Sequence, residues 1–414
     1  MNIFKRIKDK FYPFYKTKEL DLIFSILERG RDKQKKVAMF VGGCVRKHIT
    51  KQPIDDIDIA TIFSPDELKE KFNNTKVRVI NTGIEHGSVT LLINDAKFEI
   101  TTLRKDISTD GRHAEVLYTD DWQEDSKRRD FTVNAIYLDR KGNIFDPQSG
   151  VKDLKENIIK FIGDPNQRIQ EDYLRIIRYI RFSLQYNNEF DKKTLNSIKL
   201  NLNGIKNLSK ERILNELFKI LTLDNFILIS KKKELKDIFF LIFPEFKYID
   251  RLEKSNLNLE YTKSNLELLL AILLIDSSNN YEYFCHKYKT SNAVKEKLDF
   301  LSESLKQCTL DINYFKNNLK KNSYLFGKDK LKKLNKLNYF ANKQVSIKQY
   351  ITIDNNIDSI LIPKFPFNGK YLIDKGLKEG RKIGLIIRQL EEKWIENNYT
   401  LSEKSALEII NKIK

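Results

Sequence analysis

The β-like segments of this sequence are confined to its first 150 residues, and this limits the folds that the chain can adopt. A helical apolar pattern at residues 20–34 precedes these segments, and a capping box at Ser64 opens a second helix between them. The β-like runs are Val37–Val41, Asp56–Ile62, Lys76–Ile80, Ser88–Ile93 and Phe98–Thr102. Strands mixed with helices predict an α/β head with a small mixed or antiparallel sheet.

Helical periodicity replaces the β pattern beyond residue 150. The helical stretches are 166–187, 208–222, 263–276, 291–307, 326–342 and 377–397. We therefore predict that an all-α neck and body follow the head. The predicted parts are a basic N-terminal extension at 1–19, the head at 20–150, the neck at 151–224 and the body or tail at 225–414.

The positive charge of the chain is concentrated in its predicted helical part. The sequence contains 75 Lys and Arg against 57 Asp and Glu, a net charge of +18. Residues 1–150 hold 27 and 24 of these, so residues 151–414 hold 48 and 33, a balance of +15. A near-neutral head on a basic body favours a polyanion-binding role. A Lys-rich composition imposed by an A/T-rich genome is the alternative, and composition alone does not separate the two.

The sequence also limits the cellular compartment in which we expect the protein. No apolar run approaches the roughly 18 residues that span a bilayer, and the basic start lacks the apolar core of a secretory signal. The three cysteines, Cys44, Cys285 and Cys308, lie far apart and form no metal-binding spacing with histidine. We expect a cytoplasmic protein with no membrane association and no structural zinc, and the sequence indicates no protein partner.

The segment from residue 40 to 61 (FVGGCVRKHITKQPIDDIDIAT) combines two features of metal-dependent phosphate chemistry. An apolar strand runs into Gly42-Gly43, where backbone N–H groups can approach an anion, and Arg46 adds further donors. Asp56 and Asp58 are i and i+2 on the next expected strand, so both project from one face. Such carboxylates can hold two Mg²⁺ ions roughly 3.5–4 Å apart. A tight turn or a solvated strand face explains either feature alone, but their combination favours a catalytic site.

GGCVR followed by DDIDIAT resembles the signature of the polymerase-β-like nucleotidyltransferase superfamily, in the class of tRNA CCA-adding enzymes and bacterial poly(A) polymerases. The resemblance implies that Asp56 and Asp58 are catalytic Mg²⁺ ligands. Residues 97–104 (KFEITTLR) resemble a family stretch that implies Glu99 as a third catalytic carboxylate. Lys47 stands where the family usually has an acidic residue, which puts the local ion pairing in doubt.

Residues 127–135 (KRRDFTVNA) resemble the family motif associated with the ribose and triphosphate of the incoming nucleotide. Arginine forks suit phosphate oxygens, and an aspartate could accept from a ribose hydroxyl. Residues 146–154 (DPQSGVKDL) resemble a turn and helix entry between head and neck. The nucleotide-binding residues that the resemblance implies here and upstream are Gly42, Gly43, Arg46, Arg128, Arg129, Asp130 and Asn134.

Residues 171–178 (EDYLRIIR) resemble the family's base-reading motif, which implies that Asp172, Arg175 and Arg178 contact the incoming nucleotide. On a continuous helix Asp172 and Arg175 are i and i+3 and share a face. The carboxylate would accept from an exocyclic amino group and the guanidinium would donate to a ring nitrogen. Cytosine and adenine offer both groups, whereas uracil and guanine oppose them. Without the other motifs, a surface ion pair would explain this spacing.

Two further stretches separate the family's activities. Residues 82–90 (TGIEHGSVT) resemble CCA-adding enzymes, and residues 104–116 (RKDISTDGRHAEV) resemble a flexible loop thought to be needed for the final A. The resemblance therefore implies an Mg²⁺-dependent enzyme that builds the 3′-terminal CCA of tRNA from CTP and ATP without a template. Residues 225–360 resemble nothing that we can name, and their role in tRNA binding is inferred from charge and position.

Four alternatives stay open at the level of the sequence. Two are close: a poly(A) polymerase and an enzyme restricted to CC or A addition. A non-catalytic RNA-binding protein is disfavoured because the catalytic carboxylates and the base-reading residues are intact. A nucleotidyltransferase for small molecules would need neither the base-reading motif nor the basic helical body.

Overall fold

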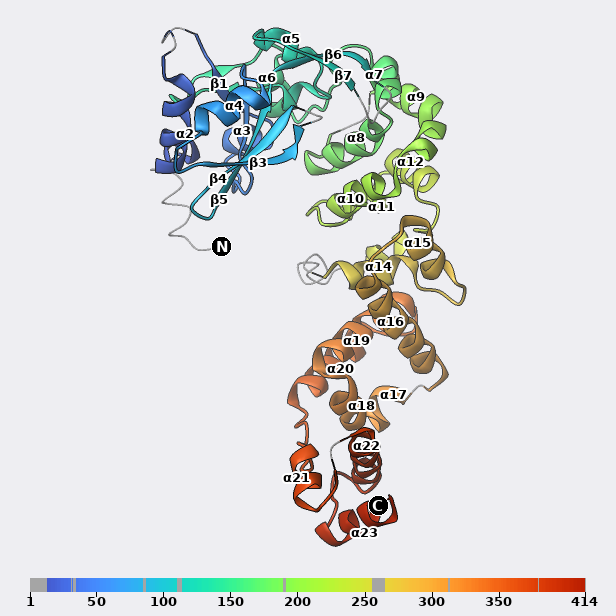
Figure 1. Ribbon diagram of the computed structural model, residues 1–414. Coiled ribbons are helices and arrows are strands. Elements are labelled where there is room, and N and C mark those ends of the chain that lie inside the picture. Colours follow the sequence, from blue (N-terminus) through green and yellow to red (C-terminus); the bar gives the residue numbers. More distant parts are fainter. Residues whose placement is uncertain are drawn as a thin grey trace. The chain divides into compact units, whose positions relative to one another are not determined.

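The computed structural model describes residues 13–30, 32, 35–84, 87–109, 114–188, 191–254, 265–311, 313–378 and 380–413 (Figure 1). The chain forms two compact units. Unit 1 comprises residues 1–249 with 286–289, and unit 2 comprises 250–285 with 290–414. The predicted division into four parts is finer than this and stays a prediction, and the first twelve residues of the predicted extension lie outside the described residues.

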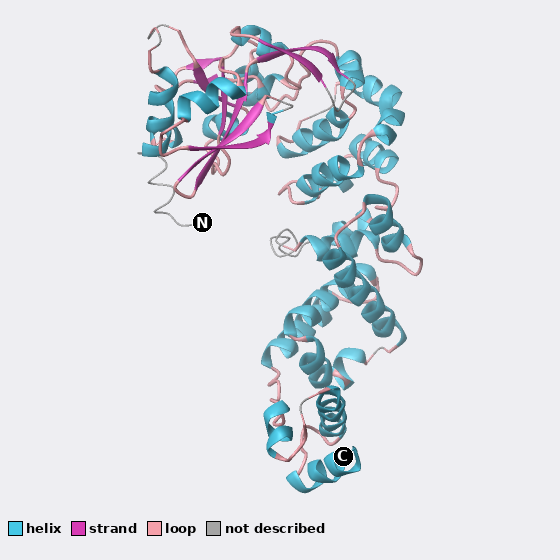
Figure 2. Ribbon diagram, viewed as in Figure 1, coloured by secondary structure: helices cyan, strands magenta, loops and turns pink. Residues whose placement is uncertain are grey.

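Unit 1 contains a mixed sheet, whose strands are magenta in Figure 2. The strand order is β3-β4-β5-β2-β1-β8-β9. Strands β2 and β5 pair in parallel, and the other neighbours pair antiparallel. The strands are β1 Ala38–Val41, β2 Asp58–Thr61, β3 Arg78–Gly83, β4 Ser88–Ile93, β5 Ala96–Thr102, β8 Tyr137–Leu138 and β9 Ile144–Phe145. This sheet and the helices beside it confirm the predicted α/β head.

The two faces of the sheet have different surroundings. The ring of Phe24, in the helix α2 (Lys18–Glu28), packs 5.0 Å from that of Phe40 in β1, so α2 covers the face that carries Phe40. Alternate residues of β1 point to the other face, where Met39 and Val41 cluster with buried neighbours from β2 and β8. Asp58 lies opposite Val41 in the β1–β2 register and therefore belongs to this second face.

Helices complete unit 1. They are α2 Lys18–Glu28, α3 Gly43–Ile49, α4 Pro65–Phe72, α5 Trp122–Lys127, α6 Gly150–Lys155, α7 Pro165–Glu171, α8 Leu174–Gln185, α9 Lys192–Asn201, α10 Lys210–Leu221, α11 Leu228–Lys231 and α12 Lys233–Ile242. Short 3₁₀ segments lie at Phe14–Lys16, Thr132–Asn134 and Leu202–Asn207. The first helix ends earlier than the predicted 20–34, because the chain leaves the helix at Arg29 and Gly30 adopts φ +73°.

Residues 104–116 form more regular structure than the predicted loop. Strands β6 (Arg104–Thr109) and β7 (Ala114–Tyr118) pair as an antiparallel hairpin apart from the main sheet. The tip of this predicted loop, residues 110–113, lies outside the described residues, as does His86 of the predicted CCA-type stretch.

Aromatic packing joins the sheet region to the first neck helices. Phe131 contacts the rings of Phe161, Tyr179 and Phe182, with centroids 4.8–5.9 Å apart. Phe161 and Tyr179 also stack at 5.5 Å. Because Phe131 directly follows Asp130, this cluster fixes the nucleotide motif against α8.

The regular secondary structure in the described residues of unit 2 is entirely helical. Its core helix α14 has every residue from Leu268 to Leu274 buried, and a separate cluster around Leu372, Ile386 and Ile410 holds the last helices together. The helices are α14 Leu266–Leu274, α16 Asn292–Leu310, α17 Tyr314–Asn317, α18 Leu319–Phe326, α19 Lys328–Ala341, α20 Ile347–Ser359, α21 Gly369–Asp374, α22 Arg381–Glu396 and α23 Glu403–Ile413. Helix α15, Asn280–Tyr288, and a 3₁₀ segment, Ile249–Lys254, span the boundary between the units. Among the residues described, no helix is both long and apolar enough to cross a membrane.

Gly150 provides a test of the packing at the entry to the neck. A β-carbon on Gly150 would lie 2.1 Å from the backbone oxygen of Thr132, so the backbone must shift to admit one. We expect Gly150→Ala to lower the free energy of unfolding by about 1–3 kcal/mol. Gly384→Ala is the matched control, since it adds a methyl group in open space on α22 and should stabilise the protein by up to about 1 kcal/mol. Urea titration of both variants measures the difference, and equal stability would contradict the packing described.

Candidate active site

A turn at Gly42 brings β1 next to the carboxylates of β2. Gly42 has φ +73°, which favours glycine, and α3 starts at the following residue. A β-carbon on Gly42 would lie 3.5 Å from the Oδ2 atom of Asp58, whereas one on Gly43 would meet open space. The Gly-Gly turn and the Asp58 carboxylate therefore form one site.

Three carboxylates gather at the start of β2 and the middle of β5. Asp58 lies directly opposite Glu99 in the parallel register, and Asp56 is two residues before it. Burial, Glu99 and Asp56 together raise the pKa of Asp58 to about 6, against the opposing charges of Arg129 and Arg46. Asp56 and Glu99 are exposed, and Asp58 is half-buried.

The prediction that Asp56 and Asp58 share one strand is wrong in one respect. Strand β2 begins at Asp58, and Asp56 lies in the segment before it. The reason is that β1 leaves the sheet at Gly42, so the β1–β2 ladder ends at the pair Val41–Asp58.

The donor set fits a hard divalent cation. Carboxylate oxygens are the ligands that Mg²⁺ prefers. Burial and then the charges of Glu99 and Asp56 raise the pKa of Asp58, and a cation at this position would offset these effects. Within the described ranges, no group of three or more His, Cys, Asp or Glu side chains is arranged to hold a metal ion. Mg²⁺ sites typically use one or two carboxylates and complete their coordination with substrate phosphates and water, which matches Asp56 and Asp58.

Lys47 forms an ion pair with a nearby acidic residue. Its Nζ atom donates to Oδ2 of Asp55 at 2.8 Å, across the loop between α3 and β2. This ion pair ties the helix after the Gly-Gly turn to the residue preceding Asp56. The departure at Lys47 therefore keeps a local ion pair beside the carboxylates.

The two arginines of the nucleotide motif are held by Asp125, a residue that the sequence analysis missed. Asp125 is fully buried; its Oδ1 accepts from Arg128 Nη2 at 2.7 Å, and its Oδ2 accepts from Arg129 Nη2 at 3.0 Å. The Tyr137 hydroxyl also donates to Oδ2 at 2.7 Å. Burial acts to raise the pKa of Asp125, but Arg129 and Arg128 outweigh it and hold the pKa well below its usual range. The signal that the sequence offered for Asp125 is its spacing, because it precedes Arg128 by three positions and Arg129 by four.

Asp130 links the nucleotide motif to α8. Its Oδ1 accepts from the Asn134 amide at 2.6 Å, and its Oδ2 accepts from Arg178 Nη2 at 2.6 Å. Asn134 in turn accepts from Nη1 of Arg46. Burial acts to raise the pKa of Asp130, but Arg178 and Asn134 outweigh it and keep the carboxyl ionised far below its usual pKa. The structure thus brings together Arg46, Asp130, Asn134 and Arg178, four of the residues predicted to bind the nucleotide.

Glu216, a second missed residue, supports this group from α10. It is buried and accepts from Arg181 Nε at 2.7 Å and from Lys219 Nζ at 3.0 Å, with Arg178 Nη1 at 3.7 Å. Its signal was a charged residue on the apolar face that Ile213, Leu217 and Ile220 form, since buried charges are paired.

The predicted i,i+3 helical pair of Asp172 and Arg175 is wrong. The expected helix at 166–187 is interrupted, because Asp172 has extended backbone angles after the end of α7. Its Oδ1 accepts from the backbone N–H of Leu174 at 3.1 Å, and its Oδ2 accepts from Arg212 Nη2 at 2.8 Å. Arg175 instead donates through Nη1 to Glu171 Oε2 and to the Arg168 carbonyl, both at 2.7 Å. The two residues remain adjacent, since the backbone N–H of Arg175 donates to the Asp172 carbonyl at 3.0 Å.

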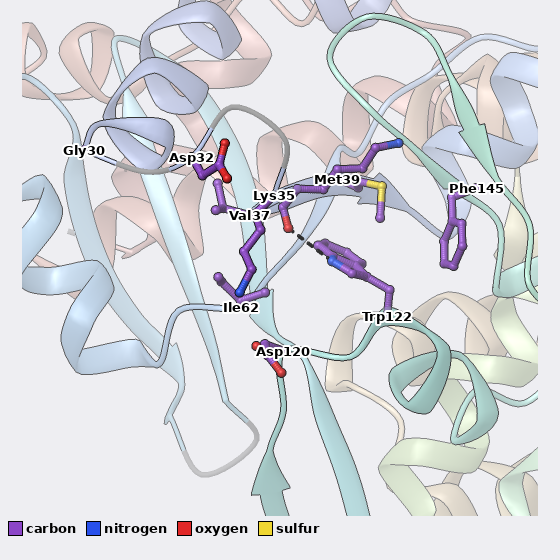
Figure 3. Close-up of a pocket in the computed structure, with 10 residues that line it drawn as sticks. Gly30, Asp32, Lys35, Val37, Met39, Ile62, Asp120, Trp122 and Phe145 are labelled. Carbon is purple, nitrogen blue, oxygen red and sulfur yellow. Dashed lines mark hydrogen bonds between the residues drawn. The ribbon is translucent and has the colours of Figure 1, made fainter.

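A cavity of about 710 Å³ opens beside α5 (Figure 3). Met39, Ile62, Trp122 and Phe145 supply its apolar walls, and Asp120 lies at its edge. The indole Nε1 of Trp122 donates to the backbone oxygen of Lys36 at 3.2 Å. Met39 and Ile62 lie on the same sheet face as Asp58, farther along the strands from the Gly42 turn.

Comparison with known proteins identifies the family models and the relatives that this chain matches. Residues 38–160 match the family model of the poly A polymerase head domain, and residues 189–249 match a probable RNA- and SrmB-binding site of polymerase A. The chain is 31% identical to the mitochondrial CCA tRNA nucleotidyltransferase 1 of Homo sapiens, over 90% of this chain and 86% of the human protein. It is 30% identical to the CCA-adding enzyme of Ligilactobacillus salivarius, over 99% of this chain and 98% of that enzyme.

A solved structure shows the same fold. The Bacillus stearothermophilus CCA-adding enzyme in complex with CTP superposes with a TM-score of 0.68 at 22% identity, covering 96% of this chain and 98% of that one. Relatives that are at least 30% identical match nearly the whole length of this chain. The protein therefore belongs to the family of CCA-adding tRNA nucleotidyltransferases.

Proposed function

We propose that this protein builds or repairs the 3′-terminal CCA of tRNA from CTP and ATP, without a nucleic-acid template and with release of pyrophosphate. The observation that carries the proposal is the carboxylate group at Asp58 beside the Gly42 turn, joined through Arg46 and Asn134 to Asp130 and α8. Family membership and the activities named for the human and Ligilactobacillus relatives support it.

In this proposal Asp56 and Asp58 would hold Mg²⁺, with Glu99 beside them. When bound there, the cation would stabilise the negative charge that develops on the attacking 3′-hydroxyl and on the leaving pyrophosphate. The protein itself positions the nucleotide. Arg46, Arg128 and Arg129 would provide donors for phosphate oxygens around the Gly42-Gly43 turn, and Asp130 with Asn134 would bind the ribose.

Base selection is assigned to the segment where α7 ends and α8 begins. Asp172 keeps carboxylate lone pairs for an exocyclic amino group even while Arg212 binds it, and Arg175 has further guanidinium donors for a ring nitrogen. Arg178 donates through Nε to Asp130 Oδ2 at 2.7 Å and so links the proposed base-reading segment to the proposed ribose-binding residue. Helices α7, α8 and α10 fix these groups, so selection requires no template strand.

The helical body after residue 225 is proposed to bind tRNA, because it carries much of the basic excess. We further propose the cytoplasm as the working compartment. The three cysteines, all of which the structure describes, are buried free thiols, as a reducing compartment permits.

The dependence of tRNA binding on salt tests the basic body. The dissociation constant should rise steeply with added KCl, and Arg381→Glu with Lys382→Glu, both exposed on α22, should flatten the slope of log K against log salt by about one to two. The matched control is Lys76→Glu with Arg78→Glu, exposed near β3 of the head, which should leave the slope unchanged. Equal slopes for the two pairs would indicate that the charge of the body reflects composition and not binding.

The hairpin offers a test of complete CCA addition. Replacing residues 105–115 with a short Gly/Ser linker should leave addition of both C residues within a few-fold of the wild-type rate and stop the product before A. Gel analysis of the products at single-nucleotide resolution measures this, and products that end in CCA at the normal rate would show that the segment is not needed for A.

The function itself is tested by the sequence of the product. Purified protein, Mg²⁺, CTP and ATP should extend a tRNA that lacks CCA to a uniform CCA end and then stop. An unrelated oligoribonucleotide is the control and should be extended poorly. Homopolymeric A added to both RNAs would instead identify a poly(A) polymerase, and products that end at CC would identify a CC-adding enzyme.

A further inference from the structure

Asp125, which holds the two nucleotide-site arginines, also contacts the β6–β7 hairpin. In addition to its bonds with Arg128, Arg129 and Tyr137, Asp125 accepts through Oδ1 a hydrogen bond from the backbone N–H of Arg104 at 3.2 Å. Arg104 is the first residue of β6 and pairs in register with Tyr118. One buried carboxylate therefore joins the start of the hairpin to the arginine pair.

The hairpin contacts α5 through the bond from Arg104 to the buried Asp125 and through an ion pair in which Lys105 Nζ lies 3.7 Å from Glu124 Oε2. Where the hairpin returns to the head, Asp120 and Trp122 line the cavity of about 710 Å³ (Figure 3). The N-terminal end of α5 thus borders open space, whereas its fourth residue, Asp125, is fully buried. A backbone bond from Thr119 to the Leu103 carbonyl at 3.0 Å closes the base of the hairpin.

Arg129 also contacts the proposed ribose-binding segment. Its Nη1 donates to the backbone oxygen of Asn134 at 3.5 Å, its Nε donates to the Tyr137 hydroxyl at 3.1 Å, and its guanidinium lies 5.1 Å from the centre of the Tyr137 ring. These contacts, together with those to Asp125, orient the guanidinium. Loss of the Asp125 charge would leave two largely buried arginines without their anionic partner, and such groups reorient or become disordered.

We propose that Asp125 is a positioning residue that sets Arg128 and Arg129 for the nucleotide phosphates and couples their arrangement to the hairpin. This rests on the proposed function, because it assigns the arginines to the incoming nucleotide. The hairpin and the nucleotide then influence one another through a single buried carboxylate, and a displacement of β6 reaches the arginines without contact between the hairpin and the nucleotide.

The test uses four single variants and one double variant of the full-length protein. Asp125→Asn removes the charge, Tyr137→Phe removes one donor to it, and Arg104→Pro removes the backbone N–H that reaches it. Arg104→Ala is the matched control, because it shortens the same side chain and keeps the N–H. For each variant we would measure kcat and KM for CTP and for ATP on tRNA, at temperatures where thermal unfolding shows every variant to be folded.

We expect Asp125→Asn to raise KM for both nucleotides about 10- to 100-fold, with kcat changed by less than about 3-fold. Arg104→Pro should raise KM by a smaller factor than Asp125→Asn does, and Arg104→Ala should raise it by less than Arg104→Pro, because it keeps the backbone N–H. The double variant Asp125→Asn with Arg104→Pro should be no worse than Asp125→Asn alone, since both act through one contact.

Wild-type KM values in folded Asp125→Asn would overturn the proposal. A double variant whose increase in KM equals the product of the increases in Asp125→Asn and Arg104→Pro would overturn it as well. If Asp125→Asn does not fold, the comparison of Tyr137→Phe and Arg104→Pro with Arg104→Ala decides it. Unchanged KM in both of the first two would overturn it. A wild-type protein that adds no nucleotides would instead reject the proposed function, so the two failures are distinguishable.

Discussion

Replacing Asp58 with alanine is expected to reduce the rate of nucleotide addition by at least about a thousand-fold, while tRNA binds nearly as well as before. The reason is that Asp58 is the carboxylate nearest to both Glu99 and the Gly42 turn, so its loss dismantles the place where a divalent cation would sit. A thousand-fold loss corresponds to about 4 kcal/mol of transition-state stabilisation, within the range that a catalytic metal supplies. Single-turnover rates and equilibrium tRNA binding measure the two quantities separately.

Asp55 provides a matched control in the same loop. It is exposed and paired with Lys47, so Asp55→Ala should change the rate by a few-fold at most. Asp56→Ala should resemble Asp58→Ala. Near-normal turnover in both Asp56→Ala and Asp58→Ala would remove the metal site from this account.

Replacing Asp172 with alanine is expected to damage the choice of base more than the chemistry. Its carboxylate would no longer accept from the amino group of cytosine, so the bias against the O4 atom of uracil would disappear. A hydrogen bond to a charged group contributes about 1.5–3 kcal/mol, which predicts a loss of roughly ten- to a hundred-fold in the preference for C over U. The measurement is kcat/KM for all four nucleotides, on tRNA ending before the first C and on tRNA ending in CC.

Arg212→Ala separates recognition from support in this prediction. Arg212 donates to Asp172 at 2.8 Å, so its removal should loosen Asp172 and lower the C/U preference by less than Asp172→Ala does. Arg175→Ala should weaken CTP and ATP together. If Asp172→Ala loses activity while the C/U and A/G ratios stay at their wild-type values, Asp172 serves as a cap for the start of α8 through Leu174 and does not read the base.

Local sequence signals predicted much of the head. The capping box at Ser64 is present. Ser64 Oγ accepts from the Glu67 N–H at 3.3 Å, and Glu67 Oε2 accepts from the Ser64 N–H at 2.8 Å. Strand β4 has its predicted bounds, Ser88–Ile93. Helices α10, α14, α16, α19 and α22 lie within or near their predicted stretches. These features depend on residues a few positions apart, so periodicity and capping detect them.

The break between α7 and α8 could not be predicted in this way, because contacts from distant segments stabilise it. Arg212, 40 residues away, binds Asp172. Tyr173 packs closely against Gly204, since a β-carbon on Gly204 would lie 2.1 Å from the ring of Tyr173. The apolar pattern continues across the break and therefore predicted a single helix. Asp125 and Glu216 were missed for a related reason, since their burial depends on how helices and strands assemble.

Adding one labelled nucleotide at a time to tRNA tests the central claim, that this protein itself selects C and then A. Purified protein with Mg²⁺ is given each of the four nucleotides singly, on tRNA that ends before the first C and on tRNA that ends in CC. The account predicts incorporation of C on the first RNA, of A on the second, and of neither U nor G on either. Incorporation of A on both RNAs, or of U as readily as C on the first, would contradict it.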